Sequence, residues 1–526
     1  MNKFSLLAAI ALCVSLSLNA ANANSSQSDQ ITQSDIATLT KAAEMGNAES
    51  QHALGMCYLF GEGVVKDNRQ GIYWLEKAAN QGFAEAQCDL GMCYVDGVGV
   101  EHDYAKAFAL FEKAANQGYR IALYDMGLCY VNGYGVKKNG GKAFYYFDKA
   151  AQQGLKEGQY NLGVCYDNGI GVKKDAKKAA YWYSKSAEQG FPDAQYDLAV
   201  CYDDGEGVKQ DAAKAVYWYE KAAQQGHSDA QYDLGVCYEE GSGVEKDYLK
   251  AAYWYEKAAE QGDDSAMFNL GMLYYNGRGV AVDYDKAFRL YEKAAKNDLA
   301  DAQYSLALCY DDGYGTKQSV EKAAYWYGRA AQLGHPDAQY DLACCYEEGA
   351  GVAQSYENAA YWYKKAAEQD DESAQYNLAN LYFNGQGVSQ DYDKAFSLFE
   401  KAAKKGHAKA QCNLGVCYER GNGVAQDAKQ AVYWYETAAK NGNTVAQYNL
   451  GYCYDAGFGV TRDLEKAAYW YEKAANNGYA KAQFCIGDCY LHGEGVAKDV
   501  KKAKYWFEKS AAQNYSKAIE ALKKLK

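Results

Sequence analysis

Positive charge, long apolar runs and histidine are all scarce in this chain of 526 residues. Its 55 lysines and arginines are outnumbered by 68 aspartates and glutamates, which gives a formal net charge of −13. A nucleic-acid backbone is therefore an unsuitable partner, because binding it requires a basic stripe. After residue 18 no apolar run is long enough to cross a bilayer, so we expect no transmembrane segment in the mature protein. The six histidines do not converge in the sequence, so we expect no metal or cofactor site.

What the chain has in abundance is repetition. A repeat of 36 residues recurs from Ala48 to Tyr515 without insertion or deletion, which makes thirteen copies. The stretch 229–262, for example, reads DAQYDLGVCYEEGSGVEKDYLKAAYWYEKAAEQG. A fixed period of this length indicates a solenoid or another repeat array. Positions within a repeat are numbered here from 1 to 36, with position 1 at residue 48 and at every 36th residue thereafter.

Each repeat is predicted to form two helices, separated in that stretch by the breaker GSGVEK. Position 20 precedes the second helix and is Asp ten times, Asn once and Ser twice, which are the residues that cap a helix N-terminus. Position 35 closes the second helix and is Gly in ten copies, with Asp298, Asp370 and Asn514 as the exceptions. The two prolines, Pro192 and Pro336, both begin a first helix, where a missing N–H costs nothing.

The two ends of the chain differ from the repeats. Residues 1–23 combine Lys3, a short apolar core and a small-residue cleavage site at residues 21–23, so they are predicted to be a cleaved signal peptide. Residues 24–34 are polar and of low complexity and are interpreted as a flexible leader. Residues 35–47 match only a second helix and residues 516–526 only a first helix, so both half-repeats are predicted to cap the array.

The repeat resembles the Sel1-like repeat, a relative of the tetratricopeptide repeat. The residues that carry the resemblance are Leu234-Gly235, Tyr238, Gly241, Gly243-Val244, Asp247, Lys250-Ala251, Trp254-Tyr255, Lys257-Ala258-Ala259 and a closing Gly262. The resemblance implies an all-α fold, an α-solenoid of stacked helix pairs in a right-handed superhelix. It also implies an adaptor or scaffold for protein complexes, with exported bacterial members linked to cell-envelope or host-interaction processes.

A cysteine-rich branch of the family carries two disulfide-bonded cysteines per repeat and includes proteins that bind or slowly cleave β-lactams. This chain departs from that branch, because the position of the second cysteine is Ala in the segment K-A-A. The sequence Ser319-Val320-Glu321-Lys322 does match S-x-x-K, the serine nucleophile signature of penicillin-recognising enzymes, but Ser319 stands at the capping position. A hydrolase or binder directed at β-lactams or peptidoglycan is therefore the alternative hypothesis, and a lumenal adaptor in protein quality control is a third.

The recurring cysteines, tryptophans and glycines are predicted to be structural. Eleven of the sixteen cysteines occupy position 10, where two other copies have Leu273 and Leu381. A position that alternates Cys with Leu is a small apolar core site, and helices stacked roughly 8–10 Å apart are too distant for disulfides along this row. We therefore expect buried free thiols, and leave the redox state of the other cysteines open. The nine tryptophans at position 27 are expected in the core between repeats, and the G-x-G pair is expected to be an interhelical turn.

Positions 2, 6, 9 and 13 share one side of the first helix by helical spacing, and we call this side the first-helix face. The face is acidic in the middle repeats and changes towards the C-terminus, to Lys409, Asn413 and Arg420. It is expected to line the concave side of the array and to bind a basic segment of a partner protein. The candidate groove residues are Asp193, Asp197, Asp204, Asp229, Asp233, Glu240, Asp337, Asp341 and Glu348.

Taken together, the residues favour a non-enzymatic, exported scaffold that binds other proteins. After cleavage of the signal peptide the protein is expected in the periplasm, at the cell surface or secreted. The oligomeric state and the identity of the partner are not encoded in these patterns.

Overall fold

The structure is a computed structural model that describes residues 33–525, and this part of the chain is all-α, with 28 helices and no strand. The predicted signal peptide and most of the predicted leader lie outside the described residues. Helix α3 (Gln33–Glu44) precedes the repeats and α30 (Ser516–Lys524) follows them.

Every repeat contains the two helices that its sequence predicts. The first helices are α4 (Ala48–Phe60), α6 (Ala84–Asp96), α8 (Arg120–Asn132), α10 (Lys156–Asn168), α12 (Pro192–Asp204), α14 (Ser228–Glu240), α16 (Asp264–Asn276), α18 (Ala300–Asp312), α20 (Pro336–Glu348), α22 (Glu372–Asn384), α24 (Ala408–Arg420), α26 (Thr444–Ala456) and α28 (Ala480–His492). The second helices are α5 (Asn68–Asn80), α7 (Tyr104–Asn116), α9 (Gly140–Gln152), α11 (Ala176–Glu188), α13 (Ala212–Gln224), α15 (Tyr248–Glu260), α17 (Tyr284–Lys296), α19 (Val320–Gln332), α21 (Tyr356–Glu368), α23 (Tyr392–Lys404), α25 (Ala428–Lys440), α27 (Leu464–Asn476) and α29 (Val500–Ala511).

The helix ends form as the capping residues predict. Oδ1 of Asp247 accepts hydrogen bonds from the backbone N–H groups of Leu249 at 3.0 Å and Lys250 at 3.1 Å at the start of α15. Gly262 ends that helix with a φ of +95°. Within the described residues, the only non-glycine residues with positive φ are the three exceptions at position 35, namely Asp298, Asp370 and Asn514. Pro192 and Pro336 stand in the first turns of α12 and α20.

The G-x-G segment is an interhelical turn, as expected, and its two glycines do different work. Gly241 adopts a φ of +79° and its N–H bonds to the carbonyl of Cys237 at 2.9 Å, which ends α14. Gly243 has a φ of +69°, and a Cβ there would lie 2.2 Å from the carbonyl oxygen of Ala212, at the start of the preceding second helix. Only glycine permits both this backbone conformation and this close approach.

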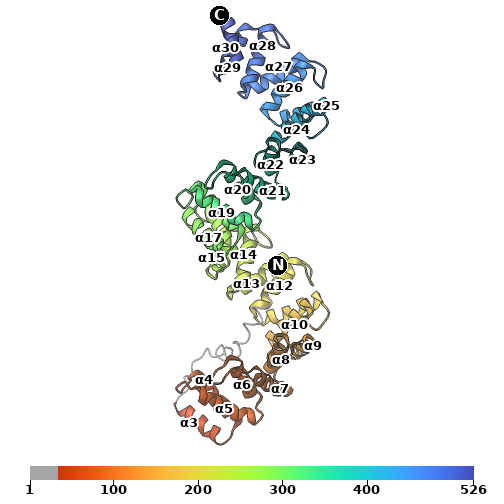
Figure 1. Cartoon of the computed structure of the whole chain (residues 1–526). Helices are drawn as coiled ribbons and strands as arrows, with labels where there is room; N and C mark the ends of the chain where they lie inside the picture. The colour runs from red at the N-terminus through yellow and green to blue at the C-terminus, as the bar shows by residue number, and fades with distance from the viewer. Residues whose placement is uncertain (1–32, 526) are drawn as a thin grey trace. The chain divides into compact units, whose positions relative to one another are not determined.

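The described residues divide into two compact units, the first up to Ala266 with Arg278–Val280, and the second Met267–Gly277 with the residues from Ala281 onwards. Within each unit a helix packs against the next one in the chain, both inside a repeat (α20 with α21) and between repeats (α19 with α20), as the succession of colours in Figure 1 shows. None of the helices in the described residues has the length and apolar character that a membrane span requires.

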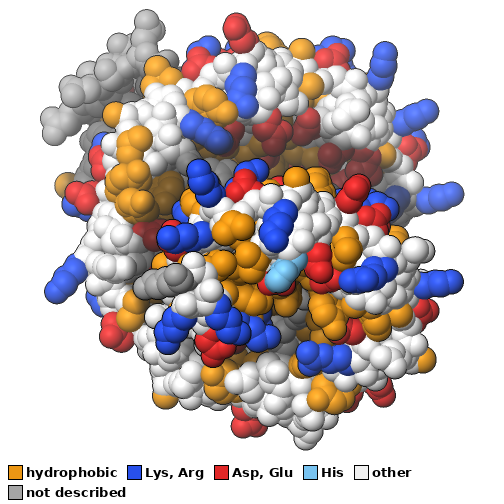
Figure 2. Space-filling model, turned by 90° about the horizontal axis from the view of Figure 1, so that it is seen from above, with side chains coloured by type: hydrophobic (Ala, Val, Ile, Leu, Met, Phe, Trp, Pro, Cys, Tyr) orange, Lys and Arg blue, Asp and Glu red, His pale blue; other side chains and the backbone are white. Residues whose placement is uncertain are grey.

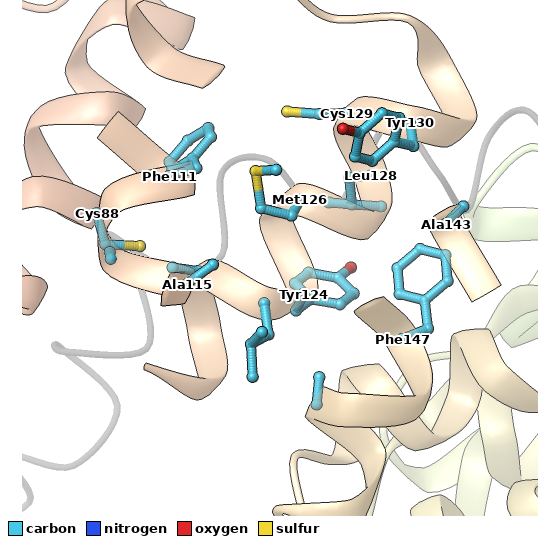
Figure 3. Packing of buried hydrophobic residues seen from close by; sticks show 14 of the residues in the cluster. Cys88, Phe111, Ala115, Tyr124, Met126, Leu128, Cys129, Tyr130, Ala143 and Phe147 are labelled. Atoms are coloured by element: carbon cyan, nitrogen blue, oxygen red, sulfur yellow. The ribbon is translucent and has the colours of Figure 1, made fainter. Parts of the chain in front are cut away.

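Buried apolar side chains from successive helices form the core. Around α8, for example, Phe111, Met126, Cys129 and Phe147 pack together from three consecutive helices (Figure 3). The fifteen described cysteines are free thiols, buried or half-buried, which confirms the prediction for position 10. Burial raises the pKa of thiols such as Cys129 to about 12, so they are not reactive thiolates at neutral pH.

The tryptophans are less deeply buried than the sequence suggests. Only Trp74 and Trp506 are buried and the other seven are half-buried, because position 27 lies at the margin of the core. Its neighbour at position 26 is exposed, as in Tyr253, whose ring meets the edge of Trp254 at 4.9 Å between centroids. The fully buried aromatic position is instead position 28, occupied in this repeat by Tyr255.

Candidate functional site

The predicted groove residues fall into an exposed group and a half-buried group. The exposed group stands at positions 2 and 13 and comprises Asp204, Asp229, Glu240, Asp337 and Glu348. Asp193 belongs beside it, since 42% of its side chain is accessible, although Oδ1 lies 3.7 Å from Nε2 of His227. These carboxylates of α12, α14 and α20 are accessible to a partner because they are exposed or partly exposed.

The carboxylates at position 6 are half-buried and bridge successive repeats. The hydroxyl of Tyr304, at position 5 of one repeat, donates to Oδ2 of Asp341 in the next repeat at 3.0 Å. Asp197 and Asp233 are hydrogen-bonded in the same way to the tyrosines of their preceding repeats, Tyr160 and Tyr196. Charge reversal at these three aspartates would therefore disturb the packing between repeats, so it is unsuitable as a test of partner binding.

Burial shifts the acidity of these half-buried carboxylates. Desolvation raises the pKa of Asp341 and of Asp233 to about 6, and that of Asp197 to about 7, although each carboxylate accepts a hydrogen bond that favours its charged form. Nearby acids add to the increase, since a like charge disfavours ionisation. An unperturbed aspartate titrates near 3.9. The first-helix face thus contains carboxylates that change charge near neutral pH.

Other repeats fill the same bridge with different pairs. Nε2 of His52 lies 2.6 Å from Oδ2 of Asp89, and Sγ of Cys88 donates to Oδ2 of Asp125 at 3.1 Å. Five repeats have Asn at position 6, and the hydroxyl of Tyr340 is hydrogen-bonded to one of them, Asn377. The Tyr340–Asn377 pair shows that the bridge also forms with an uncharged side chain at position 6.

Three histidines at position 36 cap the first helices that follow them, a role that was not predicted from the sequence. Nδ1 of His335 accepts the backbone N–H of Ala338 at 3.2 Å and so caps α20. Its ring stacks on Tyr304 with 4.4 Å between centroids, and its Nε2 lies 3.4 Å from Oδ1 of Asp301. His227 and His407 cap α14 and α24 in the same manner. These three imidazoles act as hydrogen-bond acceptors that cap helices, and they lie in three separate repeats.

A second polar pair, between positions 12 and 28, lies inside seven of the repeats. The hydroxyl of Tyr363 donates to Oε2 of Glu347 at 2.6 Å, and that of Tyr255 donates to Oε2 of Glu239 at 2.8 Å. Seven repeats have an acid at position 12, and all seven have Tyr at position 28; the pairs are Asp167/Tyr183, Asp203/Tyr219, Glu239/Tyr255, Asp311/Tyr327, Glu347/Tyr363, Glu419/Tyr435 and Asp455/Tyr471. Because a buried hydroxyl requires an acceptor, the acid and the tyrosine occur together.

The remaining repeats support the same rule. Five repeats have an apolar residue at position 12 and lack a hydroxyl at position 28; the pairs are Leu59/Leu75, Val95/Phe111, Val131/Phe147, Phe383/Phe399 and Leu491/Phe507. The exception is the repeat with Tyr275 and Tyr291, where the hydroxyl of Tyr291 donates to Sδ of Met272 at 3.1 Å. This correspondence was visible in the sequence and could have identified the pair before the structure.

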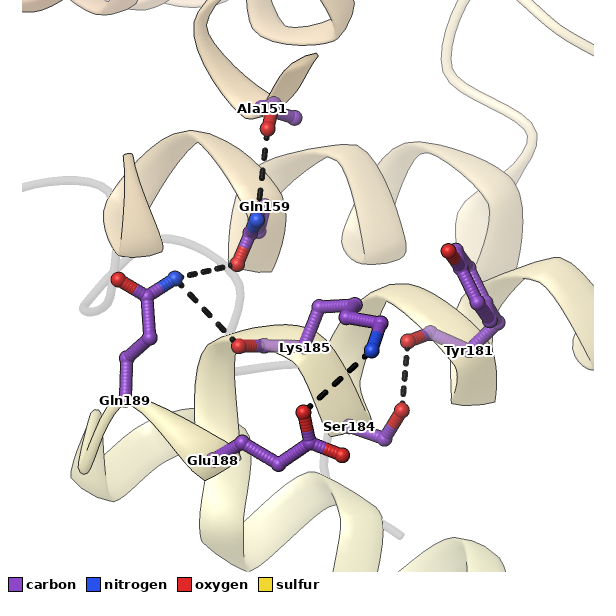
Figure 4. Close-up of polar contacts among 7 residues, drawn as sticks. All are labelled: Ala151, Gln159, Tyr181, Ser184, Lys185, Glu188 and Gln189. Atoms are coloured by element: carbon purple, nitrogen blue, oxygen red, sulfur yellow. Dashed lines mark hydrogen bonds and ion pairs between the residues drawn. The ribbon is translucent and has the colours of Figure 1, made fainter. Parts of the chain in front are cut away.

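Buried glutamines at position 4 fasten the start of the first helix. Nε2 of Gln159 donates to the carbonyl of Ala151 at 3.3 Å, and its Oε1 accepts from Nε2 of Gln189 at 2.7 Å (Figure 4). Where position 34 is Leu333 or Lys405, Oε1 of the partner glutamine, Gln303 or Gln375, accepts no hydrogen bond within the described residues. The network belongs to the frame of the repeat.

The charge of the first-helix face changes along the second unit. Asp337 and Glu348 on α20 are exposed acids, whereas Lys409, Arg420 and Lys481 are exposed bases at the corresponding positions of α24 and α28. Figure 2 shows basic side chains set among acidic ones, with no continuous basic patch among the described residues on the face in view. The acidic part of the face is thus local.

The two side chains of the S-x-x-K segment, Ser319 and Lys322, make structural contacts. Oγ of Ser319 donates to Oε2 of Glu321 at 2.9 Å and accepts the backbone N–H of Lys322 at 3.3 Å as the cap of α19. Nζ of Lys322 lies 4.9 Å from the centroid of the Tyr310 ring. Within the described residues no group of three or more His, Cys, Asp or Glu is arranged to hold a metal ion.

Comparison with known proteins agrees with the geometry. The Sel1 repeat model matches thirteen consecutive segments, from 48–83 to 480–515. A solved structure of a protective antigen present in uropathogenic Escherichia coli strains, described as displaying an SLR fold, is 37% identical, covers 86% of this chain and 97% of that chain, and has a TM-score of 0.74. A Sel1 repeat protein from Oxalobacter formigenes is 33% identical, covers 58% of this chain and 88% of that chain, and has a TM-score of 0.45. No curated protein matches the chain. With 36-residue helix pairs throughout and a family match to every one of them, this chain belongs to the Sel1 repeat family.

Proposed function

We propose that this protein is an exported scaffold that docks a basic segment of a partner protein on the acidic part of its first-helix face. Proteins built of such repeats are generally scaffolds for protein interactions. The observation that carries the proposal is the row of exposed carboxylates at Asp204, Asp229 and Glu240, on two successive first helices of one unit. The frame around them repeats, whereas these side chains differ between repeats, as is expected of a surface selected for a particular partner.

Electrostatic complementarity supports a basic occupant. Opposite charge steers the encounter and fixes the register of a partner, and repulsion rejects partners of the same sign. Asp193 adds a further partly accessible carboxylate on α12. A segment rich in lysine or arginine satisfies these carboxylates without entering the packed core.

The binding test uses a fluorescent decalysine peptide and measures fluorescence anisotropy at pH 8 and low salt. Reversal of the exposed face in the triple variant Asp204→Lys/Asp229→Lys/Glu240→Lys is expected to weaken binding at least about tenfold, a change of about 1.4 kcal/mol. The matched control reverses three exposed acids on second helices, Glu188, Glu256 and Glu260, and is expected to change binding less than about twofold. An equal loss of affinity in the two variants would show that binding depends only on the net charge of the protein, and it would refute the proposed face.

Export is supported by the pattern of residues 1–23 and by the description of the E. coli relative as a protective antigen. Fractionation of the native cells with N-terminal sequencing of the mature protein tests this part. A mature chain that begins at Asn24 is expected, and an intracellular protein that retains Met1 would contradict export.

The proposed scaffold carries out no catalysis of its own. The Ser319 hydroxyl caps α19, where it accepts the backbone N–H of Lys322, and the Lys322 ammonium lies 4.9 Å from the centroid of the Tyr310 ring. Purified protein is expected to leave nitrocefin intact. Hydrolysis that disappears in Ser319→Ala would instead establish the β-lactam-directed alternative.

A further inference from the structure

We infer that docking on the first-helix face is controlled by pH through the half-buried carboxylates at position 6, each of which is hydrogen-bonded to a tyrosine of the preceding repeat. This inference rests on the proposed function, since it concerns the same face and the same basic occupant. The inference concerns different residues from the proposed function. The exposed carboxylates at positions 2 and 13 contact the partner, whereas the half-buried carboxylates at position 6 make that binding depend on pH.

Asp341 shows the geometry most clearly. Its carboxylate lies between α18 and α20 and accepts the hydroxyl of Tyr304 at 3.0 Å. The titratable groups that face it from the surrounding elements are Tyr304 and Asp311 of α18, Tyr327 of α19, Asp337, Cys344 and Cys345 of α20 and Asp371 before α22. These are carboxylates, tyrosines and thiols, so none of them is a cation that would hold the carboxylate in its charged form.

Asp233 and Asp197 occupy the same place in the other unit. Asp233 is faced by Tyr196 and Asp203 of α12, Tyr219 of α13, Asp229 and Cys237 of α14, and Asp263 before α16. Asp197 is faced by Tyr160 and Asp167 of α10, Tyr183 of α11, Asp193, Tyr196 and Cys201 of α12, and His227 before α14. Only His227 among these groups could carry a positive charge.

The array provides its own example of the protonated state. Asparagine has the shape of a neutral aspartic acid, and it stands at position 6 in five repeats; these residues are Asn161, Asn269, Asn377, Asn413 and Asn449. Tyr340 is hydrogen-bonded to Asn377 at the place where Tyr304 is hydrogen-bonded to Asp341. A neutral side chain therefore fits the bridge, and protonation changes the charge of the face without removing the contact between repeats.

Burial places this proton uptake in an accessible range of pH. The pKa of Asp341 and Asp233 is raised to about 6 and that of Asp197 to about 7, whereas an ordinary aspartate titrates near 3.9. Between pH 8 and pH 5.5 the first-helix face of each unit thus loses charge at these positions, while a lysine segment, titrating near 10.4, keeps its own charge.

The experiment measures the affinity of the full chain for the decalysine peptide at pH 8.0 and pH 5.5, with circular dichroism at both pH values to verify the helices. Wild-type affinity is expected to fall at least about tenfold on acidification. The variant Asp197→Asn/Asp233→Asn/Asp341→Asn is expected to bind at pH 8.0 as weakly as the wild type does at pH 5.5, and to change less than about threefold between the two pH values.

The control removes the same number of charges from the same three helices. Asp204→Asn/Asp229→Asn/Asp337→Asn alters exposed acids of α12, α14 and α20, and it is expected to bind more weakly at both pH values while retaining the tenfold dependence on pH. No binding by the wild type at pH 8.0 would overturn the proposed function itself. Binding that changes less than threefold with pH, or a dependence that survives in the position-6 variant, would overturn only the pH control.

Discussion

The repeat at 120–155 and the repeat at 336–371 build the same hairpin around a buried pair of opposite character. In the first repeat, Phe147 is buried to 1% accessibility and position 12 is Val131. In the second, Tyr363 is buried completely and its hydroxyl bonds to Glu347. The difference teaches that the scaffold fixes the place of the side chain but not its polarity, provided that both members of the pair change together.

What the two repeats share should be the least tolerant of change. Gly135 and Gly351 stand at position 16 with φ of +66° and +71°, and a Cβ at either would lie 2.1 Å from a carbonyl oxygen of the preceding second helix. Substitution by Ala is expected to destabilise either repeat by about 3 kcal/mol or more, through backbone strain and steric overlap. Hydrogen exchange of the repeat's own amides provides the measurement, because a repeat array opens locally.

The matched glycines at position 35 separate strain from overlap. Gly118 and Gly334 also have positive φ, but nothing lies within 4 Å of a Cβ built on either. Their substitution by Ala is expected to cost only about 1 kcal/mol. An equal loss at both positions would show that close approach between repeats is not what position 16 protects.

Phe147→Tyr introduces into the apolar repeat the tyrosine of the polar pair without its acidic partner. The added hydroxyl would be buried beside Val131 without the acid that other repeats supply, so a loss of about 1–3 kcal/mol is expected. The double variant Val131→Glu/Phe147→Tyr is expected to recover most of the loss, measured by a double-mutant cycle on local hydrogen exchange. Losses that simply add would argue against pairing between the two positions.

Glu347→Val tests the pair from the other side. The Tyr363 hydroxyl would lose its carboxylate but retain Sγ of Cys344 at 3.3 Å, a weak partner, so a smaller loss of about 1 kcal/mol is expected. Glu347→Val/Tyr363→Phe reproduces the Val/Phe pair of the apolar repeat, and its unfolding free energy should lie within about 0.5 kcal/mol of that of the wild type. A double variant that is less stable than the single one would refute the comparison.

The last prediction concerns how the folding stability depends on pH through Asp341, the acid that bridges the 336–371 repeat to the preceding one. Because the folded pKa of Asp341 is raised to about 6, the native state binds a proton more tightly than the unfolded chain does. The unfolding free energy should therefore rise as pH falls from 8 to about 5, by about 1 kcal/mol after allowance for solvent screening. Asp341→Asn should remove this rise, and an unchanged slope in the variant would assign it to other groups.

Much of the fold was predictable from the sequence because its determinants are local. The capping residues at position 20 and the closing residues at position 35 act on the backbone beside them, so even Asp298, Asp370 and Asn514 take the left-handed conformation. The shallow burial of Trp254 was not predictable, because periodicity assigns a residue to a side of a helix and not to a depth.

The candidate site was predictable only in outline. Helical spacing correctly placed Asp229 and Asp233 on the same side of α14. It could not show that Tyr196 of the preceding repeat reaches over to Asp233 and leaves Asp229 exposed, because that contact depends on how neighbouring repeats dock.

The pair at positions 12 and 28 is completed within one repeat, and this has a consequence for how such genes change in length. A recombination event that duplicates or deletes a whole 36-residue segment carries the tyrosine and its carboxylate together, so no buried hydroxyl is orphaned. The bridge from position 5 to position 6 at the new junction must still find a suitable neighbour, and a tyrosine at position 5 accepts either Asp or Asn there. Chains of this design can thus lengthen or shorten in whole steps while every copy remains chemically self-sufficient at its centre.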